Sequence, residues 1–403
     1  MHRVSILTIL LLSAVLPAQT VWTANDDASF QNALQLAAPG DIIDVTGTVG
    51  HFQTTKPLTI RGDADVTVGQ YVGTTLAPEG GVLRIVGLRF TPPALARYDN
   101  AWIKVTSGTV FLEDVIVTMA QPAQTGLGAL RVEGTAHVVA IGCRFSGGGG
   151  GGPGLRATGL SHVSAVDCRF DGGDGGCDPW GACQDGFDGI LMLYEGTSLQ
   201  LSGCTVNAGD GGDPVPSPLG YALPGKGIWA AGSRVWVSDS TVRGGNAGTH
   251  PGGNALHATG IGHIEVARST LIPGTGTPDG SATFGDVVVD ASLIGAWLDG
   301  PLVVGTRTDL SILAPTATMP FAIVMSLTLE RWEFPISAQP LWWGSPGSLW
   351  IQLYASSTVA GAATMPIRLP NDPVVRDIAV WFHVFGGTSL PVASAPVVGG
   401  VIR

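Results

Sequence analysis

A short pattern that returns six times between about Ile103 and Leu271 constrains this chain more than any other feature. The copies read VFLEDVIV from Val110, VVAIGCRF from Val138, VSAVDCRF from Val163, LQLSGCTV from Leu199, VWVSDSTV from Val235 and IEVARSTL from Ile264. A shorter apolar segment precedes each copy, and a glycine-rich loop follows most of them. Successive copies start 28, 25, 36, 36 and 29 residues apart. A repeat this short cannot bury a core of its own, so the copies must stack on one another.

The repeat alternates apolar residues with small or polar ones, which is the period of a β-strand. No copy carries a helical period. Three short strands per turn, at least 25 residues per turn and variable loops at one corner predict an all-β right-handed parallel β-helix. These features resemble the pectin lyase-like β-helix superfamily over about residues 20–300. The resemblance implies a fold and no particular activity, because that fold hosts lyases, hydrolases, adhesins and stalks.

The ends of the predicted β-helix carry different signals. A helix is expected over Asp27–Ala38, with Asp26 or Asp27 as its cap and an apolar face on one side. It resembles the helix that caps the first coil in this superfamily. Near Gly300 the repeats stop, and short strands separated by turns follow. We therefore expect a β-helix over 20–303 and a small antiparallel β-sandwich over 304–403. The latter resembles C-terminal β-sandwiches of exported bacterial repeat proteins, which implies surface attachment or sorting.

Residues 1–19 read as a secretory signal, with an apolar run from Val4 to Leu16 and small residues after it. No second apolar run of spanning length follows, so the mature chain is expected to be secreted or held at the cell surface without a membrane span. The net charge of −11 argues against nucleic acid and anionic membrane as partners.

The five cysteines fall into two groups. Cys143, Cys168 and Cys204 occupy one position of three successive copies. Stacked identical residues are what coils in register produce, so these three are expected to be buried thiols. Cys177 and Cys183 lie together in the loop CDPWGAC. In an exported protein we expect a disulfide between them, and a zinc site is the weaker interpretation.

Acidic residues gather in the loops after the repeat. Alignment on the cysteine position places Asp171 in one outward column and Asp174 and Asp210 in another, three residues further on. Clustered oxygen ligands among glycines suit Ca²⁺, so Asp171, Asp174 and Asp210 are candidate metal ligands. The alternative is that Asp, Asn and Gly simply form turns here. No other cofactor is expected.

A further outward column lies on the short strand before each repeat. It is expected to contain Lys104, Arg131, Arg156, Met192, Trp229 and His257. Arginine pairs with carboxylates and tryptophan stacks on sugar faces, so Lys104, Arg131, Arg156 and Trp229 could bind an acidic polysaccharide. The superfamily resemblance implies a second possibility, in which a strand-face arginine such as Arg131 or Arg156 takes the proton of a uronate. The structural alternative is that nearby acids such as Glu133 simply balance these cations.

The sequence contains no convergent acid–base set, nucleophile elbow, P-loop or HExxH motif. We therefore expect a non-catalytic exported surface protein that is structural or adhesive. The alternative is a polysaccharide lyase, a hydrolase or a glycan-binding module that acts on an acidic extracellular polysaccharide through Arg131 and Arg156.

Overall fold

A computed structural model describes most of the chain. The described residues are 7–8, 19–62, 65–67, 73–91, 101–118, 128–147, 152–175, 185–211, 222–289, 292–327, 330–332, 341–343, 349–355, 361–372, 375–387 and 392–403. Two compact units emerge: Gln19–Asp290 forms one, and Met1–Ala18 with Ala291–Arg403 forms the other. Each is described separately below.

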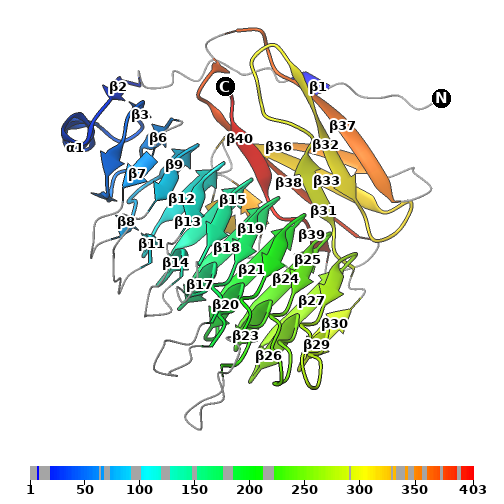
Figure 1. Ribbon diagram of the computed structural model, residues 1–403. Coiled ribbons are helices and arrows are strands. Elements are labelled where there is room, and N and C mark those ends of the chain that lie inside the picture. The colour runs from blue at the N-terminus through cyan, green and yellow to red at the C-terminus, as the bar shows by residue number, and fades with distance from the viewer. Residues whose placement is uncertain are drawn as a thin grey trace. The chain divides into compact units, whose positions relative to one another are not determined.

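The first unit is a parallel β-helix, which confirms the predicted class (Figure 1). Three consecutive strands form one coil, and each strand pairs in parallel with its equivalent in the next coil. In the described part of the chain, the three resulting sheets contain eleven, nine and nine strands. We call them sheet 1, sheet 2 and sheet 3, in the order in which each coil visits them.

Sheet 1 consists of β2 (Val21–Ala24), β3 (Ile42–Val45), β6 (Thr59–Arg61), β9 (Val82–Val86), β12 (Thr109–Glu113), β15 (His137–Ile141), β18 (His162–Val166), β21 (Ser198–Ser202), β24 (Arg234–Ser238), β27 (His263–Ala267) and β30 (Val287–Val289). Sheet 2 consists of β4 (Val49–Gly50), β7 (Asp65–Thr67), β10 (Arg89–Thr91), β13 (Ile116–Thr118), β16 (Arg144–Ser146), β19 (Arg169–Asp171), β22 (Thr205–Asn207), β25 (Thr241–Arg243) and β28 (Thr270–Ile272). Sheet 3 consists of β5 (Gln53–Thr54), β8 (Thr74–Leu76), β11 (Ile103–Val105), β14 (Leu130–Val132), β17 (Leu155–Thr158), β20 (Ile190–Leu193), β23 (Ile228–Ala231), β26 (Leu256–Thr259) and β29 (Thr283–Phe284).

A sharp corner joins sheet 1 to sheet 2 in each coil and explains part of the repeat. One residue there adopts a left-handed backbone, which favours Gly and, among other residues, Asn and Asp. These residues are Gly87, Asp114, Gly142, Asp167, Gly203, Asp239 and Arg268, with φ between 48° and 74°. Arg268 is the exception in residue type, and its guanidinium binds both carboxylate oxygens of Asp239 at 2.7 and 2.8 Å.

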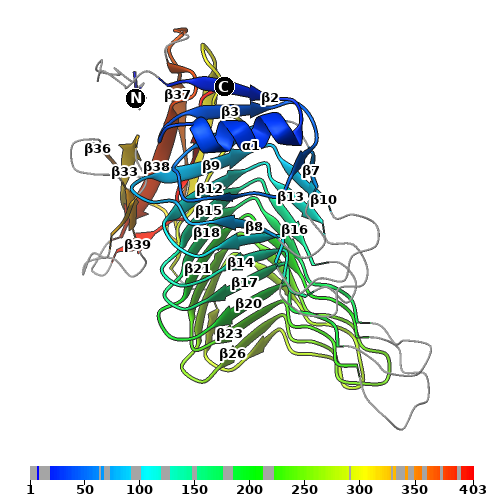
Figure 2. The same ribbon diagram turned by 90° about the vertical axis from the view of Figure 1, so that its left-hand side faces the viewer.

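The helix α1 (Asp27–Leu36) covers the first coil, as predicted from the sequence (Figure 2). Its N-cap is Asp26, whose side chain accepts a hydrogen bond from the backbone N–H of Ser29 at 2.8 Å. Phe30, Ala33 and Leu34 are buried. At the other end of the helix, the Lys56 ammonium donates to the carbonyl oxygens of three residues in the last turn and just after it, at 2.7–2.9 Å. The helix thus supplies an apolar cover for coil ends that would otherwise meet water.

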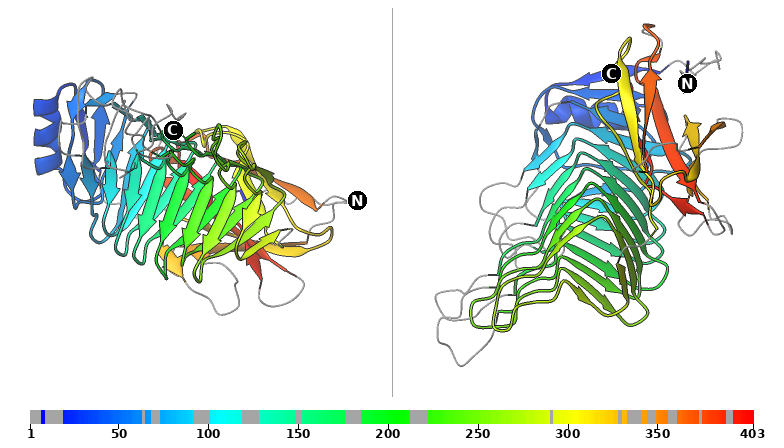
Figure 3. Two further views of the ribbon diagram at one scale, coloured as in Figure 1. Left: turned by 60° about the horizontal axis from the view of Figure 1, so that its bottom comes forward. Right: turned by 90° about the vertical axis from the view of Figure 1, so that its right-hand side faces the viewer.

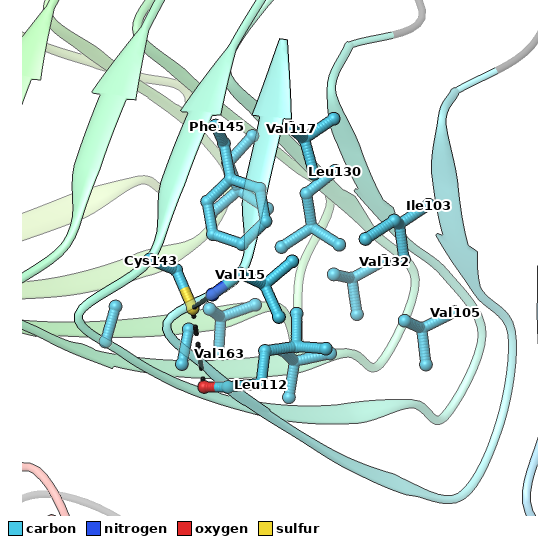
Figure 4. Packing of buried hydrophobic residues seen from close by; sticks show 14 of the residues in the cluster. Ile103, Val105, Leu112, Val115, Val117, Leu130, Val132, Cys143, Phe145 and Val163 are labelled. Atoms are coloured by element: carbon cyan, nitrogen blue, oxygen red, sulfur yellow. Dashed lines mark hydrogen bonds between the residues drawn. The ribbon is translucent and has the colours of Figure 1, made fainter. Parts of the chain in front are cut away.

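The core of the β-helix is built from stacked columns, and Cys143, Cys168 and Cys204 form one of them. All three are buried free thiols, which confirms the sequence-based expectation. The Cys143 sulfur lies 3.4 Å from both the Val115 nitrogen and the Leu112 oxygen of the preceding coil (Figure 4). Beside this column, the rings of Phe145 and Phe170 stack with centroids 5.4 Å apart. Like residues therefore pack on like residues along the axis.

The glycine-rich loops between sheets 2 and 3 stack beside one another (Figure 3). Their backbones form a continuous ladder, in which each N–H donates to the segment that lies next to it. The N–H groups of Gly225, Gly245, Gly253 and Gly274 donate to the carbonyls of Gly209, Gly225, Gly245 and Gly253 at 2.8–3.0 Å. A Cβ atom on Gly245 would lie 2.0 Å from the oxygen of Gly209. The ladder therefore requires glycine, which explains the composition of these loops.

The second unit contains mainly antiparallel sheets, as predicted for the C-terminal region. One sheet orders β1 (Leu7–Thr8), β37 (Ala362–Arg368), β32 (Arg307–Leu313) and β31 (Gly295–Leu298), with only the β1–β37 pair parallel. The second orders β36 (Leu349–Ala355), β33 (Pro320–Ser326), β38 (Ala379–Gly386) and β39 (Ala393–Ser394), and β40 (Val398–Val401) also pairs with β38. β34 (Glu330–Trp332) and β35 (Leu341–Trp343) form a hairpin.

The sequence placed the boundary between the two units at 303/304. In the structure the last β-helix strand is β30, and β31 already pairs antiparallel with β32. Residues 301–305 therefore belong to the second unit.

Candidate functional site

The outer face of sheet 3 brings together most of the residues that the sequence proposed for ligand binding. Strand pairing places Lys104 beside Arg131, and Arg131 beside Arg156. Further along the same row, Trp229 lies beside His257 and His257 beside Phe284. The neighbouring positions on each strand, such as Ile228 and Ala230, are buried in the core. The row therefore faces outward, and we call it the outer row of sheet 3.

One member of this row was assigned wrongly from the sequence. Met192 was expected between Arg156 and Trp229, but Arg156 pairs with Leu191 and Leu191 pairs with Trp229. Met192 is fully buried and faces the core. Side chains alternate along a strand, so an alignment error of one residue moves a side chain to the opposite face. The sequence also missed Phe284, which ends the row and is 52% exposed.

Lys104 and Arg131 are both held by one carboxylate. The Lys104 ammonium lies 3.0 Å from Glu133, and the Arg131 guanidinium makes a close ion pair with the other oxygen of the same side chain. This arrangement matches the structural alternative, in which a nearby acid balances the two cations. Within the described ranges, by contrast, Arg156 makes no ion pair with an acidic side chain, and its Nε atom, like that of Arg131, is buried without a hydrogen-bond acceptor. Arg156 is therefore the cation of the row that is available to an added anion.

The rings at the other end of the row form an ordered group. The Trp229 and His257 rings meet edge to face at a centroid distance of 5.9 Å. His257 and Phe284 stack at 4.5 Å with an angle of 6° between their planes. The Lys226 ammonium lies 4.6 Å from the Trp229 ring centroid, a cation–π geometry. The Trp229 Nε1 donates to Thr259 Oγ1 at 3.0 Å, which fixes the indole.

Asp188 lies in the loop that leads into β20 and is bonded to Lys226, the residue whose ammonium lies over the Trp229 ring. Its carboxylate is almost fully buried and accepts a hydrogen bond from the backbone N–H of Lys226 at 2.7 Å. Burial raises the pKa of Asp188 to about 6, although the nearby Lys226 charge opposes the shift. The pKa of the His257 imidazole is lowered, mainly by burial and also by the Lys226 charge. Of these groups, Lys226 and His257 contact the indole directly, and Asp188 is linked to it through Lys226.

The candidate calcium ligands occupy two different environments. Asp171 binds the Arg169 Nε atom at 2.8 and 2.9 Å and accepts from the Asn207 amide at 2.8 Å. Asp174 and Asp210 instead continue a ladder that links successive loops. Asp174 accepts from the backbone N–H of Asp210 at 3.0 Å, and Asp210 accepts from that of Asn246 at 2.7 Å.

The acidic loops also border a shallow groove of about 490 Å³, lined in part by Asp210, Asn246 and Thr275. Asn246 continues the ladder by accepting from the Thr275 N–H at 3.0 Å. Among the residues that the structure describes, no group of three or more His, Cys, Asp or Glu side chains has the arrangement of a metal site. Calcium binding stays a prediction, and the ladder gives Asp174 and Asp210 a structural role without it.

The expected disulfide between Cys177 and Cys183 lies outside the described residues. In the described ranges, no helix combines the length and the apolar character needed to cross a bilayer.

Comparisons with known proteins add little to this description. No family model matches the sequence, and no curated protein matches it. Two solved chains match in structure. One is the crystal structure of the Dettilon tailspike protein, with 9% identity, a TM-score of 0.34, and coverage of 92% of this chain and 91% of that one. A likeness this weak does not support a transfer of function.

Proposed function

We propose that this chain is an exported, non-catalytic adhesive protein that binds an acidic carbohydrate along the outer row of sheet 3. One observation carries the proposal: the row presents cations on successive rungs and then aromatic rings on successive rungs, all in register. Rungs of a sheet are separated by about 4.8 Å, so the row offers a linear and evenly spaced set of contacts. A linear chain of sugars is a ligand that matches such a surface.

The residue types of the row suit the two chemical faces of an acidic sugar. A guanidinium binds a carboxylate through paired hydrogen bonds, and Arg156 has no acidic partner in the described part of the chain. Indole and phenyl rings offer apolar surface to the C–H faces of a sugar ring, and Phe284 is the most exposed ring of the row. We therefore assign the carboxylate-binding role to Arg156 and the stacking role to Trp229 and Phe284.

The same geometry favours binding over catalysis. General acid–base chemistry needs a group that can exchange a proton within hydrogen-bond reach of the substrate. Glu133 and Arg131 are already paired with each other, and Glu133 also pairs with Lys104, so none of these groups is free to contact a substrate proton. The lyase alternative would therefore depend on Arg156 alone as the base. Arginine surrenders its proton only with great difficulty, so that alternative is the weaker one.

The proposed role outside the cell requires that the chain is exported. The apolar run in residues 1–19 is the only basis for this part of the proposal. N-terminal sequencing of the protein secreted by an expressing cell tests it, and we expect the mature chain to begin just after Ala18 or Gln19. Full retention of the unprocessed chain inside the cell would contradict it.

Binding can be tested by calorimetry with defined oligomers of galacturonate, mannuronate and neutral glucose. We expect an acidic oligomer to bind, Arg156→Gln to weaken binding about tenfold or more, and Trp229→Ala to do the same. Arg243→Gln is the matched control, because it removes an exposed arginine from sheet 2. Absence of binding to every acidic oligomer would overturn the proposal. Appearance of an unsaturated product that absorbs in the ultraviolet would support the lyase alternative instead.

A further inference from the structure

The outer row of sheet 3 carries its net positive charge at intervals, and the interval limits which acidic polymer fits it. The strands β17, β20 and β23 follow one another in this sheet (Figure 2). On the middle strand the row is occupied by Leu191, which pairs with Arg156 on one side and with Trp229 on the other. The rungs on both sides of Leu191 each carry a cation. Because rungs are about 4.8 Å apart, the two cations lie at levels separated by about 9.6 Å along the axis.

The second of these cations is Lys226, which lies beside the row and was not among the candidates from the sequence. It is two residues before β23, and its ammonium lies 4.6 Å from the centroid of the Trp229 ring. The charge of Asp188 is felt at Lys226, but the Asp188 carboxylate accepts from the Lys226 backbone N–H and makes no ion pair with the ammonium. Among the described residues, the Lys226 ammonium and the Arg156 guanidinium are thus two cations of this face without a carboxylate in ion-pair contact.

The other end of the row is less positive than its residue types suggest. Lys104 and Arg131 share the carboxylate of Glu133, so the three side chains together leave one net positive charge over two rungs. Arg156 and Lys226 add one positive charge each, with the uncharged Leu191 between them. The face therefore offers about one net positive charge for every two rungs.

Leu191 makes the position between the two cations unsuitable for an acid. Its side chain has no hydrogen-bond donor, so a carboxylate placed against it would lose water without gaining a partner. A neutral sugar carries no charge that must be desolvated there. A pyranose unit in an extended chain is roughly as long as one rung spacing, so a polymer that lies along the row places one sugar on each rung.

We propose that the preferred ligand of the outer row is a polysaccharide in which acidic and neutral sugars alternate. One carboxylate binds Arg156, the next carboxylate along the polymer binds Lys226, and the neutral sugar between them lies on Leu191. This inference rests on the proposed carbohydrate binding and adds the charge repeat of the ligand. A polymer with a carboxylate on every sugar brings more negative charges than the row has cations to receive, so it is the weaker ligand.

Two hexasaccharides of the same linkage test the charge repeat. One alternates glucuronate and glucose, and the other consists of glucuronate only. Calorimetry at pH 5 keeps Asp188 largely neutral, since its pKa is about 6, while the sugar carboxylates stay ionised. We expect the alternating hexasaccharide to bind the full mature chain about tenfold more tightly or better, although it carries half as many carboxylates.

The outcomes separate this inference from the proposed function. Equal or tighter binding of the all-glucuronate hexasaccharide would overturn the alternating repeat and leave carbohydrate binding standing. The same holds if neither hexasaccharide binds while a galacturonate or mannuronate oligomer does. If no acidic oligomer binds, both the inference and the proposed function fail.

A substitution on the middle rung tests the role of Leu191. Leu191→Arg fills the gap between the two cations, so it should raise the affinity for the all-glucuronate hexasaccharide about tenfold and change that for the alternating one little. Thr241→Arg is the control, because it adds the same charge to β25 of sheet 2. If Leu191→Arg strengthens both ligands equally, or if Thr241→Arg does the same as Leu191→Arg, total charge and not its spacing determines binding, and the inference is wrong.

A pair of variants tests the role of Lys226. Lys226→Gln removes the charge and keeps the backbone N–H that binds Asp188, whereas Lys226→Arg keeps both. Binding of the alternating hexasaccharide should weaken about tenfold in Lys226→Gln and stay near the parent value in Lys226→Arg. Unchanged binding in Lys226→Gln would remove the second cation, and with it the spacing of two rungs, from the recognition of the ligand.

Discussion

The carboxylate of Asp188 accepts a hydrogen bond from the backbone N–H of Lys226, 2.7 Å away and one rung further along the β-helix. Burial raises the pKa of this carboxyl from an ordinary value of 3.8 to about 6. The folded state therefore binds more protons than the unfolded chain between these two pH values. The contribution of the Asp188 carboxyl to the free energy of unfolding is therefore fully present below pH 3.8, and it is lost as the pH rises through about 6.

Asp188→Asn should remove this loss of stability at high pH. The amide oxygen of the new side chain can still accept the hydrogen bond from the Lys226 N–H, and the amide carries no charge at any pH. The free energy of unfolding at pH 7.5 should rise by up to about 3 kcal/mol, and the gain should vanish near pH 4. Urea denaturation of parent and variant at both pH values measures this. Asp185→Asn is the control, since its exposed carboxylate makes the same kind of bond to the N–H of Leu223 at 2.7 Å. An equal effect of Asp188→Asn at both pH values would contradict the prediction.

The glycine ladder should tolerate no side chain. Gly245→Ala would bring a Cβ within 2.0 Å of the Gly209 oxygen, and backbone cannot move aside as a flexible side chain can. Gly260→Ala is the matched case, because Gly260 has φ +63° and open space around it. For Gly260→Ala we expect the free energy of unfolding to fall only by the cost of a left-handed backbone at alanine, about 1–2 kcal/mol. Denaturation curves should show a larger loss for Gly245→Ala. Equal losses would indicate that the loops rearrange freely.

The cysteine column should be chemically inert in the folded protein. Burial raises the pKa of Cys168 and Cys204, so neither forms the reactive thiolate at pH 8. In a variant with Cys177 and Cys183 replaced by alanine, an aromatic disulfide reagent should label no thiol until denaturant is added, and then three. Labelling of any thiol in the native state, at a rate that exceeds global unfolding, would show that the column is accessible.

The acidic ladder should depend on an acceptor atom and not on a charge. Asp210→Asn keeps an oxygen for the Asn246 N–H and should change the free energy of unfolding little, whereas Asp210→Ala should cost about 0.5–1.5 kcal/mol. Melting in millimolar Ca²⁺ and in chelator tests the calcium prediction with the same proteins. If Ca²⁺ binds the folded state, it must raise the melting temperature of the parent and not of a variant with Asp174→Asn and Asp210→Asn. Equal melting of the parent in both solutions would leave the ladder as the role of these residues.

The sequence by itself determined the β-helix, its cap and its core columns. The positions of Cys143, Cys168 and Cys204 in consecutive copies were enough to place three thiols on adjacent inward rungs. The pattern around Phe30 was likewise enough to identify the helix that covers the first coil. These features are local or repeated, so each copy of the pattern reports the same environment. The register of neighbouring strands follows from the repetition wherever the copies of the pattern align without a gap.

Only the tertiary structure decided what the outward residues do. Leu191, and not Met192, faces outward because the long loop before β20 leaves the register of that strand open until it pairs with β17. Glu133 joins Lys104 and Arg131 across neighbouring rungs, which leaves Arg156 as the available cation. The raised pKa of Asp188 likewise depends on which surfaces are covered. Burial and ion pairing are set by neighbours distant in sequence, so a pattern of residue types does not contain them.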